Sequence, residues 1–122
     1  MLTLYLNVPQ RYLLLQLLPK QGSIQTISQL RDATKKIRPS SSEEIELGID
    51  IQPTGAVTWN REKGLVLRPV VVSEKALKMI VESMKELDKK ESLPVHEEIQ
   101  ALWDQIVEGK SFEPTKEAAV DN

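Results

Sequence analysis

The spacing of apolar residues changes period twice along the chain, and no other feature of the sequence constrains the fold as strongly. Apolar residues recur at helical spacing over residues 8–47, alternate with polar residues over 49–72, and return to helical spacing over 74–108. Helical spacing is typical of amphipathic helices, whereas alternation is typical of strands that are buried on one face. The sequence therefore predicts an α+β fold, with helices around a small β-sheet.

The first region predicts three helices, at residues 8–18, 24–38 and 42–47. The first of these is apolar on most faces, which is typical of a helix in the centre of a core. Asn7 and Gln10 match the pattern of a capping box at its start. Local signals alone therefore define the beginning of this helix.

The middle region predicts a three-stranded antiparallel β-meander over residues 49–52, 56–60 and 65–71. A Pro-Thr-Gly turn separates the first two strands, as expected for a hairpin. Pro69 places the third strand at an edge of the sheet or at a bend, because proline cannot donate to a strand ladder. Residues 2–6 also alternate and predict a short strand or an extended lead-in.

Three helices followed by a hairpin are also the element order of a winged helix, a DNA-binding fold. In this alternative Arg61 and Lys63 lie near the tip of the wing. The third helix would enter the major groove, yet it carries Glu43, Glu44 and Glu46. Because these carboxylates would be repelled by phosphate, a nucleic-acid-binding regulator is the less favoured hypothesis.

The last region predicts two further amphipathic helices, at residues 74–90 and about 95–108. A chain of 122 residues has the usual size of one domain. We therefore interpret residues 1–109 as a single globular domain. Residues 110–122 contain little that could be buried, and we expect them to form a mobile polar tail.

The sequence contains no cysteine and a single histidine, His96. This composition excludes disulfides, cysteine-containing zinc sites, thiol catalysis and any site that needs several imidazoles. The glycines are isolated, so none forms a phosphate-binding loop, and no nucleophile motif accompanies the histidine. We therefore expect a protein without enzymatic activity, bound metal or cofactor.

Charges of opposite sign gather in two neighbouring segments, a basic helix over 24–38 and an acidic segment after it. With 16 basic and 18 acidic residues the chain is close to neutral, so such patches favour steering toward a protein partner over binding to uniform phosphate. The alternative is that these charges only keep two helix faces solvated. A tryptophan after the hairpin is either a core residue or an interface anchor. The candidate interaction surface comprises Arg31, Lys35, Lys36, Arg38, Glu43, Glu44 and Trp59.

No apolar run approaches the roughly 20 residues that a bilayer span needs, so we expect no membrane association and a cytoplasmic location. Self-association is a further expectation. The stretches 65–67 and 70–72 are apolar, and only Arg68 and Pro69 guard them against pairing with a second copy at the sheet edge.

The segment from Arg11 to Gly22 resembles part of a group of small proteins found in phage and prophage genomes. The Ser-Glu-Glu run at 42–44, the Gly-x-x-x-Trp-Asn hairpin at 55–60 and the two C-terminal helices are similar as well, so the resemblance covers residues 8–108. These motifs are caps, turns and core positions, and they carry over no catalytic residue. The resemblance implies a phage-encoded accessory protein, in the host cytoplasm or in the virion, that binds a host protein or is a small component of the particle.

Overall fold

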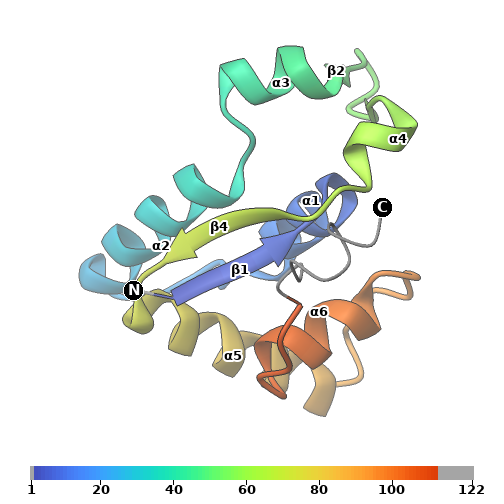
Figure 1. The fold of residues 1–122 in the computed structure, drawn as a ribbon. Coiled ribbons are helices and arrows are strands. Elements are labelled where there is room, and N and C mark those ends of the chain that lie inside the picture. Colours follow the sequence, from blue (N-terminus) through green and yellow to red (C-terminus); the bar gives the residue numbers. More distant parts are fainter. Residues whose placement is uncertain (1, 113–122) are drawn as a thin grey trace.

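The computed structural model describes residues 2–112, which form an α+β fold as predicted (Figure 1). The elements in chain order are β1 (Leu2–Leu6), α1 (Val8–Leu17), α2 (Ile24–Ile37), α3 (Ser41–Leu47), β2 (Asp50–Ile51), β3 (Val57–Thr58), α4 (Arg61–Gly64), β4 (Arg68–Val72), α5 (Glu74–Lys89) and α6 (Ile99–Ile106). One antiparallel sheet joins β1 to β4, and a second, smaller sheet joins β2 to β3.

The central sheet pairs the first strand with the fourth, and Figure 1 draws β1 and β4 side by side. Leu4 lies opposite Val70, and Leu2 lies opposite Val72. Alternation directs Leu4, Leu6, Val70 and Val72 to one face, where all four are buried. There they join a single hydrophobic cluster with apolar residues of α1, α2, α5 and α6.

The predicted three-stranded meander is wrong. Its hairpin forms, but with strands of only two residues each, and its third strand pairs with β1 instead. The reason is burial: Val70 and Val72 need a partner strand that also faces the core, and residues 2–6 supply one. The β2–β3 hairpin does not supply a strand that faces the core, because its Ile51 is 60% exposed. Residues 65–67 lie outside the strand, where Leu65 and Val66 are exposed, whereas residues 70–72 belong to β4, which pairs with β1 along one edge only.

A side-chain amide covers part of the outer edge of β1. Gln105 of α6 accepts a hydrogen bond from the Tyr5 N–H at 2.7 Å and donates one to the Tyr5 carbonyl at 3.0 Å. Both backbone groups of Tyr5 therefore point away from Pro69, its partner on β4. Since no hydrogen bond at this position of the ladder needs a donor from β4, proline is tolerated there. Both strands of a two-stranded sheet are edge strands, so the predicted place of Pro69 in an edge strand is confirmed.

The segment between Arg38 and Pro69 contributes no residue to the hydrophobic cluster, and we call it the arm. It contains α3, β2, β3 and α4, which stand apart from α5 and α6 at the top of Figure 1. Helix α3 buries only Leu47 and leaves Ile45 84% exposed. The element order of a winged helix is present, but α3 shares no extensive contact with α2, unlike a recognition helix.

The last helix is shorter than predicted at both ends. Helix α6 begins at Ile99 and ends at Ile106; residues 94–96 adopt no regular structure, Glu97 and Glu98 form a turn, and Val95 is fully exposed. The mobile polar tail was expected over residues 110–122. At its start the Lys110 N–H donates to the Asp104 carbonyl, and residues 113–122 lie outside the described residues. Over residues 2–112, no helix combines the length and the apolar character needed to cross a bilayer.

Candidate functional site: a groove between the arm and helix α1

A buried arginine connects the arm to the body of the protein. Arg11 of α1 is only 2% exposed, and its guanidinium donates to both carboxylate oxygens of Glu43 on α3, at 2.8 and 3.2 Å. Its Nε also donates to the carbonyl of Ile37, the last residue of α2, at 2.6 Å. One side chain therefore joins three helices.

A second ion pair extends this network to the strand that ends the arm. Arg68 of β4 contacts Glu46 at 2.6 Å and lies 4.0 Å from Glu43. Hydrogen bonds from Arg11 above all, and from the Ser40 N–H, lower the pKa of Glu43 to about 2, although partial burial opposes this shift. Glu43 therefore has a structural role in fixing the arm, and its place on the interaction surface stays a prediction.

The lowered pKa of Glu43 predicts a loss of stability in acid. The carboxyl binds its proton more readily in the unfolded chain, so its contribution is complete above pH about 5 and is lost as the pH falls toward about 2. Urea unfolding should give a difference in free energy between the wild type and Glu43→Gln that shrinks by about 1–2 kcal/mol from pH 6 to pH 3. A difference that does not change with pH would contradict this assignment.

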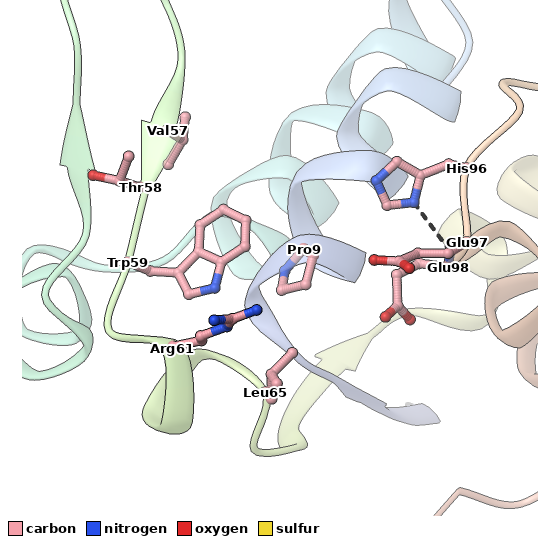
Figure 2. A pocket seen from close by; sticks show the side chains of 9 residues that line it. All are labelled: Pro9, Val57, Thr58, Trp59, Arg61, Leu65, His96, Glu97 and Glu98. Carbon is pink, nitrogen blue, oxygen red and sulfur yellow. Dashed lines mark hydrogen bonds between the residues drawn. The ribbon is translucent and has the colours of Figure 1, made fainter.

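A groove lies where the arm faces the start of α1 (Figure 2). Its main hollow has a volume of about 470 Å³. A smaller hollow of about 190 Å³ shares Pro9, Trp59 and His96 with it, so the two form one groove, which we call the Trp59 groove. The further lining residues are Val57, Thr58, Arg61, Leu65, Glu97 and Glu98 in the main hollow and Tyr12, Leu13, Gln16, Pro94 and Val95 in the smaller one.

Trp59 forms the arm side of the groove. It is partly exposed, lies outside the hydrophobic cluster, and directs its indole ring toward Pro9 in Figure 2. Within residues 2–112 its Nε1–H has no hydrogen-bond partner, and no buried side-chain nitrogen or oxygen of that range is unpaired. The indole N–H therefore reaches the surface of the groove. Trp103, by contrast, packs against the cluster and donates to Glu108.

The position of the indole depends on the absence of a side chain at residue 64. A Cβ atom added to Gly64 would lie 2.1 Å from Cδ1 of Trp59, which is far inside van der Waals contact. Since ring atoms cannot yield without rotating the whole side chain, Gly64→Ala should displace the indole. We expect the fluorescence maximum of Trp59 to shift in a Trp103→Phe background. Equal spectra for Gly64→Ala and the parent would contradict this packing.

The opposite wall of the groove carries acidic groups. The Glu98 N–H donates to Nδ1 of His96 at 3.0 Å, and its carboxylate accepts from Gln10 of α1 at 2.9 Å. This fixes the wall relative to α1. Glu97 and, across the groove, Arg61 form no ion pair within the described part of the chain. Within the described part of the chain, the groove therefore presents two carboxylates without an ion pair, Glu97 and Glu98, opposite the unpaired positive charge of Arg61.

Tyr12 lines the smaller hollow and is partly buried. Burial and the nearby Glu44 raise the pKa of its phenol, while Arg11 and Arg38 act in the opposite direction. The structure therefore brings Arg38 and Glu44, two residues of the expected surface, close to Tyr12 and to the groove.

The other basic residues of the expected surface are not part of the groove. Arg31, Lys35 and Lys36 are exposed on α2 and line none of the hollows that contain Trp59. Three lining residues were not identified as site residues from the sequence. Pro9 and Tyr12 were interpreted only as residues of the first helix, and the sequence indicates no interaction partner for Glu97. Among the residues of the expected surface, Trp59 is the one that lines the groove.

Residues 2–112 contain no group of three or more histidines, aspartates or glutamates that could hold a metal ion. The site is thus an open groove with an aromatic side chain, two prolines and opposed charges. Comparisons with protein-family models, with curated proteins and with solved structures give no significant match to this chain.

Proposed function

We propose that this chain is a non-enzymatic interaction protein that binds a segment of another protein in the Trp59 groove. The observation that carries the proposal is the partly exposed indole of Trp59, whose N–H is unpaired in the described chain and opens into a groove. Tryptophan is enriched among the residues that dominate the energy of protein interfaces. A ring that lies outside the core and beside an open groove has the environment of such an anchor.

The charges around the groove favour a protein over a nucleic acid. Glu97 and Glu98 line it, and they would repel phosphate, whereas Arg61 on the facing wall suits a partner of mixed polarity. The exposed lysines of α2 are the feature that favours the nucleic-acid alternative. They lie outside the groove, and the chain as a whole has a net charge of −2.

The resemblance to small phage and prophage proteins supports a narrower version of this proposal. In that version the chain is a phage-encoded accessory protein, and its partner is a host protein or a component of the particle. Self-association through the exposed apolar residues Leu65 and Val66 is compatible with a role as a component of the particle. Sedimentation that gives only monomer at high micromolar concentration would argue against self-association.

Affinity capture from nuclease-treated host lysate, followed by mass spectrometry, tests the proposed function. We expect wild type and Trp103→Phe to retain the same partner protein, and Trp59→Ala to lose it. Reversing Lys35 and Lys36 to glutamate should leave folding intact, because both are exposed, and should weaken capture only if α2 steers the partner. Loss of every captured protein after nuclease treatment would favour the nucleic-acid alternative, and capture that Trp59→Ala leaves unchanged would contradict the site.

A further inference from the structure

We infer that the segment bound in the Trp59 groove is rich in proline, adopts the polyproline II conformation and carries a basic residue at the end that meets Glu97. This inference rests on the proposed function and names the chemistry of its partner. Three properties of the groove carry it: its free donors, its exposed apolar surfaces and its opposed charges.

The first property is the kind of polar group that the groove offers. Trp59 Nε1–H and the Tyr12 hydroxyl are donors, and neither has a hydrogen-bond partner within residues 2–112. A polyproline II segment has no internal hydrogen bonds, so all its carbonyl groups are available to accept. Proline lacks an N–H and requires no acceptor in return. Two free donors therefore favour a segment whose carbonyl groups are all free to accept, while the acceptors of the opposite wall, Glu97 and Glu98, suit a charged side-chain donor of that segment.

The second property is the apolar surface beside Trp59. Pro9 lies between Trp59 and His96 in Figure 2, and Pro94 and Val95 line the adjoining hollow. Val95 is fully exposed although it is aliphatic. Rings of a polyproline II segment dock in grooves of this kind with little loss of entropy, because the segment is already extended.

The third property sets the charge of the bound segment. Glu97 is an exposed carboxylate without an ion pair in the described chain, and it lies on the same wall as His96 and Glu98. Arg61 occupies the facing wall, beside Trp59. A lysine or arginine of the segment therefore fits the acidic wall, whereas an acidic residue at that end would be repelled.

Calorimetric titration of the full chain with synthetic peptides tests this inference. The probes are a peptide of six prolines that ends in arginine, the same peptide ending in glutamate, and an arginine-ended peptide in which glycine and serine replace the prolines. We expect saturable binding of the first, about tenfold weaker binding of the second, and none of the third.

Variants of the protein test the two donors. Trp59→Phe keeps an aromatic ring and removes the N–H, and Tyr12→Phe removes the hydroxyl, so each should weaken binding about three- to tenfold. Glu97→Gln should remove most of the difference between the arginine and glutamate peptides, and Trp103→Phe is the matched control.

The outcomes separate this inference from the function on which it rests. If no proline peptide binds while capture of a protein partner still requires Trp59, the proline chemistry is wrong and the interaction site stands. If capture is also independent of Trp59, the proposed function fails with it. Equal binding of the glycine-serine peptide, or displacement of the proline peptide by a single-stranded oligonucleotide, would likewise overturn the inference.

Discussion

Arg11→Met is expected to lower the free energy of unfolding by about 3 kcal/mol. Methionine retains the buried stem of the side chain but leaves the Ile37 carbonyl and the Glu43 carboxylate without their donor. The arginine is 2% exposed, so water cannot fully replace the lost hydrogen bonds. Urea unfolding followed by circular dichroism at pH 7 measures the effect.

The matched control for this prediction is Arg31→Met on the exposed face of α2, which should change stability by less than about 0.5 kcal/mol. The double variant Arg11→Met/Glu43→Leu should cost less than the sum of its two single changes, because it leaves no unpaired buried charge. If Arg11→Met costs no more than Arg31→Met, the buried ion pair does not hold the arm.

Trp59→Ala is expected to weaken binding of the captured partner by about 2 kcal/mol, or about thirtyfold. The change removes the largest side chain of the groove together with its free N–H donor. It should cost little folding stability, since Trp59 lies outside the hydrophobic cluster. Calorimetric titration of the purified partner into each variant gives the affinities.

Trp103→Phe is the matched control, because Trp103 packs against the core and lines neither hollow of the groove. It should leave the affinity for the partner unchanged. The proposed site would be contradicted if Trp59→Ala remains folded and binds as tightly as the wild type.

The starts of α1 and α3 could be predicted from the sequence to within one residue because capping groups determine them, whereas α6 has no side-chain cap and starts later than predicted. Asn7 accepts from the Gln10 N–H, and the Gln10 side chain accepts from the Asn7 N–H, so the capping box is confirmed. The start of α3 was displaced by one residue in the prediction. Its capping box joins Ser40 to Glu43, and this choice also places the Glu43 carboxylate where Arg11 can reach it.

Pairings between distant parts of the chain could not be predicted in the same way. The sheet joins residues 2–6 to 68–72, and the hydrophobic alternation of either strand is equally compatible with a neighbour in the meander. Arg11 and Glu43 meet only because α1 and α3 are brought together in space. An isolated charge in an apolar helix does not indicate its partner.

The site was predictable only in part, for the same reason. Trp59 was identified as a candidate anchor, but the groove also requires Pro9 and Tyr12 from α1 and residues 94–98 from the loop before α6. These three stretches lie far apart in sequence and are gathered by the packing of α1, α6 and the arm. Charge patterning pointed instead to α2, where Arg31, Lys35 and Lys36 are exposed but line no part of the groove.

The indole N–H region of a nitrogen–proton correlation spectrum tests the central proposal most directly, because the chain contains only two tryptophans. On titration with the captured partner, the signal of Trp59 should shift strongly, since its free N–H lies in the groove, while that of Trp103, bonded to Glu108, should remain in place. Trp59→Phe assigns the two signals. A partner that binds without moving the Trp59 signal would contradict the proposal that this groove is the interaction site.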